Sequence, residues 1–185
     1  MPELMLALAG TSLVGMAVTT MLFAAGRGGE EEQAVRSLVV ESKVVTSRLN
    51  ASLRSCRRVL SVSGTRVILW TGDTDNDGLV DADELGIIDH DAANTQLAYS
   101  TPTLPNPAEW DAATENFTSA TLALQATDNL DTTVWSNRVD VAVFTTDSPG
   151  NPVAATLIAY RIEITRGTLT ETTSHSVALR NHEQN

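Results

Sequence analysis

The chain has 185 residues, of which 42% are hydrophobic and 4% aromatic, and its formal net charge at pH 7 is -11. This length allows one domain of ordinary size plus an extended element. The acidic balance and the scarcity of aromatic rings argue against a nucleic-acid-binding protein, which needs a basic patch for phosphates. The charge is also uneven: residues 1–66 carry +3 and the remainder carries -14, which indicates two environments.

The first predicted element is a hydrophobic helix. Residues 4–25 contain no charged residue and no proline, and as a helix they would span roughly 33 Å, about the thickness of a bilayer core. Small residues recur along this stretch, as they do where helices pack closely without water. We therefore expect residues 1–29 to form a unit of their own, a membrane or filament-core helix with a glycine-rich end.

The start of this helix carries a resemblance to a known family. The sequence Met1-Pro2-Glu3-Leu4, followed by the uncharged run, resembles the start of type IV pilins and pseudopilins after removal of their leader. On that match Glu3 corresponds to the family's glutamate, which is thought to pair with the terminal amine of a neighbouring subunit and to set the register of assembly. The alternative is an interfacial Glu3 that is stabilised by the positive end of the helix.

Three glycines, Gly26, Gly28 and Gly29, follow this stretch. Because each glycine costs about 1 kcal/mol of helix stability, we expect the helix to break there. Apolar residues then recur mainly at three- to four-residue steps from Val35 to Leu60. This spacing predicts an amphipathic helix over residues 30–60, the first element of a globular head formed by residues 30–185.

The rest of the head is predicted to be mainly strands. Strands are expected at residues 67–70, 86–90, 96–99, 138–145, 155–165 and 168–180, and a helix at residues 107–126. The predicted fold class is therefore α+β. In it a long N-terminal α-helix, hydrophobic in its first half and amphipathic in its second half, packs on an antiparallel β-sheet head domain.

The strongest chemical motif is an acidic loop. Residues 73–84 fit the twelve-residue EF-hand calcium loop, with acidic oxygens at loop positions 1, 3, 5, 9 and 12 and glycine at position 6. The predicted ligands are Asp73, Asp75, Asp77 and Glu84 directly, Leu79 through its carbonyl and Asp81 through water. The predicted cofactor is calcium in a structural role, since the loop is not flanked by two helices. The alternative is an acidic turn that needs no metal.

These features together predict a function. We find no catalytic sequence motif and do not expect an enzyme. The expected function is a structural subunit of a type IV pilus-like filament that polymerises through its N-terminal helix. Two alternatives stay open: a minor pilin or type II secretion pseudopilin, and a membrane-anchored calcium-binding surface protein that does not polymerise.

The resemblance also implies partners and a location. It implies a homo-oligomeric helical filament, a prepilin peptidase and the pilus assembly machinery as partners, and no nucleic acid is expected. It places the subunit in the inner membrane before assembly and then in an extracellular filament on a bacterial cell surface.

Overall fold

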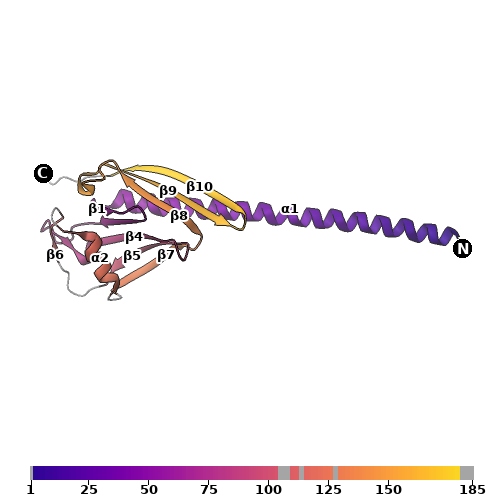
Figure 1. Cartoon of the computed structure of the whole chain (residues 1–185), viewed down its shortest axis with the longest axis horizontal. Helices are drawn as coiled ribbons and strands as arrows, with labels where there is room; N and C mark the ends of the chain where they lie inside the picture. Colours follow the sequence, from indigo (N-terminus) through magenta and orange to yellow (C-terminus); the bar gives the residue numbers. More distant parts are fainter. Residues whose placement is uncertain (1, 104–108, 113–114, 127–128, 180–185) are drawn as a thin grey trace. The chain divides into compact units, whose positions relative to one another are not determined.

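The computed structural model describes the backbone of residues 2–103, 109–112, 115–126 and 129–179 (Figure 1). Within helix α1 it describes the side-chain surroundings of residues 16, 18–21 and 32–55. The chain divides into two compact units, Met1–Val39 and Val40–Asn185. The boundary predicted from the sequence, after residue 29, lies earlier in the chain than this boundary after Val39.

Helix α1 runs from Pro2 to Ser55. Its described backbone has no break at Gly26, Gly28 and Gly29, because about 1 kcal/mol per glycine is small beside the cooperative gain of a helix of 54 residues. The helix ends before residue 60, where the apolar spacing predicted its end. The chain then enters a strand at Arg58.

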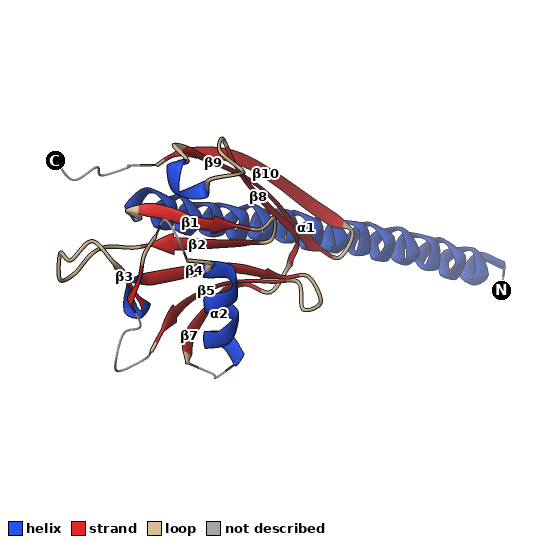
Figure 2. Cartoon of the chain, turned by 60° about the vertical axis from the view of Figure 1, so that its left-hand side comes forward, coloured by secondary structure: helices blue, strands red, loops and turns tan. Residues whose placement is uncertain are grey.

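The second unit contains a five-stranded antiparallel sheet with the order β1-β2-β4-β5-β7 among the described residues. Its strands are β1 (Arg58–Val62), β2 (Arg66–Trp70), β4 (Leu85–Asp91), β5 (Gln96–Pro102) and β7 (Leu130–Ser136). Helix α2 (Phe117–Ala126) lies beside this sheet (Figure 2). A buried apolar cluster packs between α2 and the sheet, and it includes Leu60, Ile68, Trp70, Val80, Leu85, Phe117 and Leu124.

The other strands of this unit form two smaller antiparallel sheets. Strands β8 (Val139–Thr146), β9 (Leu157–Arg166) and β10 (Leu169–Ala178) pair in the order β10-β9-β8. The short strands β3 (Val80–Asp81) and β6 (Glu109–Trp110) pair with each other. Two 3-10 turns, η1 (Ala82–Glu84) and η2 (Pro152–Ala154), complete the described elements.

The C-terminal part of α1, within the second unit, supplies one side of the core. Val45, Leu49 and Leu53 recur every four residues on one face of the helix, and each is 0% exposed. Polar contacts tie the same part of α1 to the three-stranded sheet: Ser42 Oγ lies 2.8 Å from Thr173 Oγ1. The apolar spacing read from the sequence therefore identifies the buried face correctly here.

The observed fold corrects the predicted fold class. Among the residues whose side-chain surroundings the structure describes, strands account for 44% and helices for 31%, and the longest such stretch of α1 is residues 32–55, only 24 residues. The predicted fold class is therefore wrong: the described residues form three antiparallel sheets and not one, and the described packing of α1 is confined to its C-terminal part. Strand β7, whose residues 131–134 are exposed and mostly polar, and strand β1, whose Leu60 the apolar spacing had assigned to the helix, form the edges of the five-stranded sheet. They add strand content that the hydrophobic pattern does not reveal.

The predicted localisation is corrected as well. A helix that crosses a bilayer needs about 20 consecutive, mainly apolar residues. Among the described residues, no helix reaches the combination of length and apolarity that a membrane crossing requires. This finding contradicts the predicted inner-membrane stage and the localisation that was built on it.

Candidate metal centre

The acidic loop of residues 73–84 lies in the connection between β2 and β4, as expected for a strand connection. These two strands pair antiparallel, with Trp70 opposite Leu85, so the connection leaves and re-enters the sheet at neighbouring points. The backbone N–H and the Oγ1 of Thr71 donate to the carbonyl of Glu84 at 2.8 and 2.7 Å. The sheet therefore holds the first and last residues of the loop close together.

The middle of the loop is shaped by local turns. Gly78 has φ 82°, in the left-handed region that favours glycine, as the sixth position of such a loop requires. The carboxylate of Asp77 accepts a hydrogen bond from the backbone N–H of Leu79 at 2.7 Å. Strand β3 then leads the chain into η1, which ends at Glu84.

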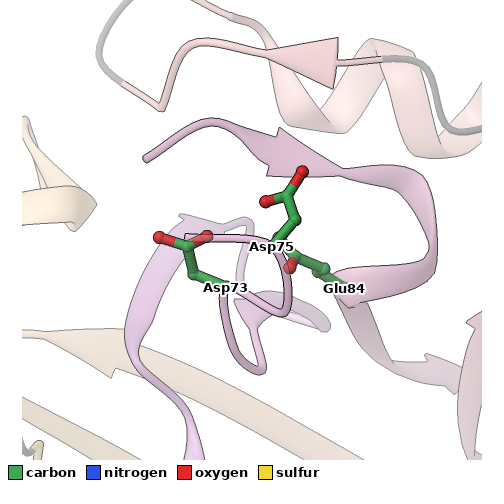
Figure 3. A group of neighbouring side chains, drawn as sticks. All are labelled: Asp73, Asp75 and Glu84. Atoms are coloured by element: carbon green, nitrogen blue, oxygen red, sulfur yellow. The ribbon is translucent and has the colours of Figure 1, made fainter. Parts of the chain in front are cut away.

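Three carboxylates converge in this loop. Asp73, Asp75 and Glu84 each present an oxygen, and these atoms lie within 4.8 Å of one another (Figure 3). Calcium–oxygen bonds are about 2.3–2.6 Å long, so two ligands on opposite sides of one ion are about 4.6–5.2 Å apart. This acidic triad can hold a metal ion.

Buried oxygens without partners fit the same conclusion. Among the described residues, Oδ1 of Asp73 and Oδ1 of Asp81 are buried and have no hydrogen-bond partner. The side chain of Asp73 is 1% exposed, and Asp81 is 7% exposed. Burying an unpartnered carboxylate oxygen costs free energy, and a bound cation would remove that cost.

The electrostatics of Asp81 show the crowding of negative charge. Burial raises the pKa of Asp81 first, and the nearby carboxylates of Asp75 and Glu84 raise the pKa further. A divalent cation would favour the ionised form of these groups, because an opposite charge nearby stabilises a carboxylate. The residues present therefore suit a hard cation that binds oxygen ligands.

Glu84 is oriented before any ion binds. Its Oε2 accepts hydrogen bonds from Trp70 Nε1 at 2.9 Å and from the backbone N–H of Asp81 at 3.3 Å. Its Oε1 accepts a hydrogen bond from Thr74 Oγ1 at 3.0 Å and a second one from the backbone N–H of Thr74. Since Glu84 is only 2% exposed, these contacts fix its carboxylate at the edge of the hydrophobic core.

Arg57 contacts the acidic triad from outside the loop. Its Nη1 donates a hydrogen bond to Oδ2 of Asp73 in an ion pair that is almost fully buried. Burial by itself would raise the pKa of Asp73, but the hydrogen bond and charge of Arg57 outweigh burial and hold this pKa below its usual value. Asp73 is therefore ionised at neutral pH.

The structure brings together only part of the predicted ligand set. The triad contains Asp73, Asp75 and Glu84 and includes neither Asp77 nor Asp81. The carboxylate of Asp77 is engaged by Leu79, whose own predicted role was to offer a carbonyl oxygen. The side chain of Glu3, the predicted assembly residue, lies outside the described residues.

Three residues around the site were not predicted from the sequence: Arg57, Trp70 and Thr74. Thr74 lies inside the loop, and its hydroxyl next to Asp73 is a local signal that could have suggested a bond to Glu84. Arg57 reaches the site because β1 pairs with β2, and Trp70 reaches Glu84 because β2 pairs with β4. Local spacing does not reveal this long-range pairing.

Comparisons with known proteins do not add a family to these observations. No protein-family model matches the chain, and no curated protein sequence matches it.

Proposed function

We propose that this chain is a non-catalytic structural protein whose head is stabilised by one calcium ion in the loop of residues 73–84. One observation carries this proposal: Asp73, one of three converging carboxylates, has a buried oxygen without a hydrogen-bond partner. An all-oxygen donor set favours calcium or magnesium over softer metals. Calcium takes six to eight oxygens from a flexible loop, whereas magnesium keeps several waters, so the loop favours calcium.

The ion would act as a cross-link within the head. Asp73 follows β2, and Glu84 precedes β4 and is bonded to the core through Trp70. A ligand that binds only the folded state stabilises it by about 2.7 kcal/mol when its concentration is 100 times Kd. For a chain of this size, that corresponds to a rise in Tm of about 5–10 °C.

Thermal unfolding of the full chain tests this proposal. We expect Tm to be about 5–10 °C higher in excess calcium than in excess chelator, and the rise with magnesium to be smaller. Identical unfolding curves in calcium and in chelator would contradict the proposed calcium site.

We propose a second function, self-assembly into a filament of the type IV pilin kind, from a separate observation on α1. Met16, Val18 and Met21 are 70%, 51% and 78% exposed on a stretch that contains no charged residue. Several large, exposed apolar side chains on an uncharged stretch favour contact with a partner protein. The same stretch of a second copy is also apolar and uncharged, so it is a suitable partner. Electron microscopy of the purified full chain should show filaments, and particles of single-chain size under all conditions would contradict this function.

A further inference from the structure

Arg57 lies against the proposed metal site without being one of its ligands. Its side chain is 15% exposed, and its guanidinium group pairs with Oδ2 of Asp73. The other oxygen of this carboxylate, Oδ1, has no partner among the described residues. Asp73 thus binds the guanidinium group of Arg57 with one oxygen and leaves the other oxygen for a metal ion.

Arg57 is held in this position by Trp70. The guanidinium carbon lies 4.3 Å from the centroid of the Trp70 ring, within the range of a cation–π contact. The backbone N–H of Arg57 donates to the carbonyl of Trp70 at 2.7 Å. Trp70 in turn donates to Glu84, so Arg57 and Trp70 connect two members of the acidic triad from outside the loop.

We propose that Arg57 is a resident counter-cation of the metal-binding loop. It stabilises Asp73 in the metal-free protein and lowers the affinity of the loop for a divalent cation. The inference rests on the proposed metal site, and it explains how a loop with several neighbouring carboxylates keeps its fold before an ion arrives. Without Arg57, like charges in the metal-free loop would repel one another with less compensation.

The alternative role, a residue that merely orients Asp73 for the metal, fits the contacts less well. The sheet also holds the two ends of the loop together, because the backbone N–H and the Oγ1 of Thr71 donate to the carbonyl of Glu84. The position of Asp73 next to Glu84 therefore does not depend on Arg57 alone. Removal of Arg57 does take away the positive charge beside the site, and this charge repels a bound metal ion.

The test compares the full chain with its Arg57→Gln, Arg57→Lys and Arg58→Gln variants. Arg58→Gln removes the same charge one residue away, and Arg57→Lys keeps the charge at the site. Tm is measured in excess chelator and in excess calcium, and Kd for calcium is measured by titration. A neighbouring charge typically shifts the ionisation of a carboxylate by one unit or more, so we expect Arg57→Gln to lower Kd by about tenfold.

We also expect the variants to differ in how calcium changes their Tm and in their Kd for calcium. Arg57→Gln should lose more Tm in chelator than in calcium, so its calcium-induced rise in Tm exceeds that of the unmodified chain. Arg58→Gln and Arg57→Lys should keep Kd within about threefold of the unmodified value, because both leave a positive charge at position 57 beside Asp73. If Arg57→Gln does not fold in chelator, calcium should restore its folding.

Each other outcome overturns the inference. Weaker calcium binding by Arg57→Gln would show an orienting role, and an equal loss of Tm in both solutions would show a merely structural one. A variant that stays unfolded in calcium would show that a bound cation does not replace Arg57. No calcium-induced rise in the unmodified chain would overturn the metal site itself, which separates the failure of the proposed function from the failure of this inference.

Discussion

At Glu84 the acidic loop of residues 73–84 meets the hydrophobic core. The residue ends η1 and precedes β4, and its carboxylate accepts hydrogen bonds from Trp70 and from Thr74. A glutamate at the last position of a calcium loop usually contributes both oxygens to the ion. The contacts in this structure therefore orient the residue that we expect to contribute most to metal binding.

Replacement of Glu84 by Gln tests this role. The variant keeps the shape of the side chain but loses a charge and one acceptor oxygen, so we expect calcium affinity to fall by at least about tenfold. Asp83→Asn is the matched control, because Asp83 is exposed and adjacent and loses the same charge. Calcium titration of both variants is the measurement, and equal losses of affinity would show that only net charge matters.

The sequence identifies some residues of this site and not others, for a physical reason. The loop spacing from Asp73 to Glu84 is local, so the sequence alone reveals its oxygen donors. Arg57 is brought to Asp73 by the pairing of β1 with β2, whose register shifts between Val59 and Ser61. A one-residue change in register would turn the side chain to the other face, and no local pattern fixes that register.

At the scale of elements, the connection between β8 and β9 is closed by Asp147. Its Oδ1 accepts hydrogen bonds from the backbone N–H groups of Thr156 and Leu157 at 3.0 and 3.2 Å. Its Oδ2 accepts a hydrogen bond from Thr156 Oγ1 at 2.6 Å. The hydrogen bond from the Thr156 side chain is the main cause that lowers the pKa of Asp147; burial opposes it, and the backbone N–H groups add to it.

This lowered pKa predicts how stability depends on pH. A carboxylate whose folded pKa lies below its unfolded value, about 3.9, stabilises the fold above that value and loses this effect as pH falls through the folded pKa. Asp147→Ala should therefore lower Tm by on the order of 2 °C at pH 7, and the difference should shrink below about pH 4. Thermal unfolding from pH 3 to pH 7 is the measurement, with Asp140→Ala, an exposed carboxylate in β8, as control. A difference that does not vary with pH would contradict this role.

The elements differ in how well the sequence predicts them. Strands β2, β4, β8 and β9 were predicted because buried apolar side chains alternate or run together in them. Strand β7 was missed because its residues 131–134 are exposed and mostly polar, as expected for the edge of a sheet. The helix expected over residues 107–126 is present only as α2, Phe117–Ala126; β6 occupies Glu109–Trp110, and residues 107–108 lie outside the described residues.

At the scale of the whole molecule, the two compact units suggest two tasks. The second unit contains the candidate metal centre, and the first unit, Met1–Val39, contains the exposed apolar side chains of Met16, Val18 and Met21. The sequence predicts a division after residue 29, whereas the structure divides the chain after Val39. The sequence does not locate the boundary at Val39, because α1 continues through the glycines without a change in backbone conformation.

Charge substitution on α1 tests the proposed filament. Combined Met16→Lys and Met21→Lys substitutions place two positive charges where we propose that copies of the helix pack, so filaments should be lost. Leu122→Lys is the matched control, since Leu122 is 50% exposed on α2 in the other unit. Electron microscopy of both variants is the measurement. Filaments that persist in the double variant would place the contact elsewhere.

A crystal structure of the full chain grown with calcium, with anomalous scattering to locate the ion, tests the central claim most directly. We predict one ion about 2.3–2.6 Å from oxygens of Asp73, Asp75 and Glu84. A loop with no ion at millimolar calcium, or an ion bound only outside residues 73–84, would contradict the claim.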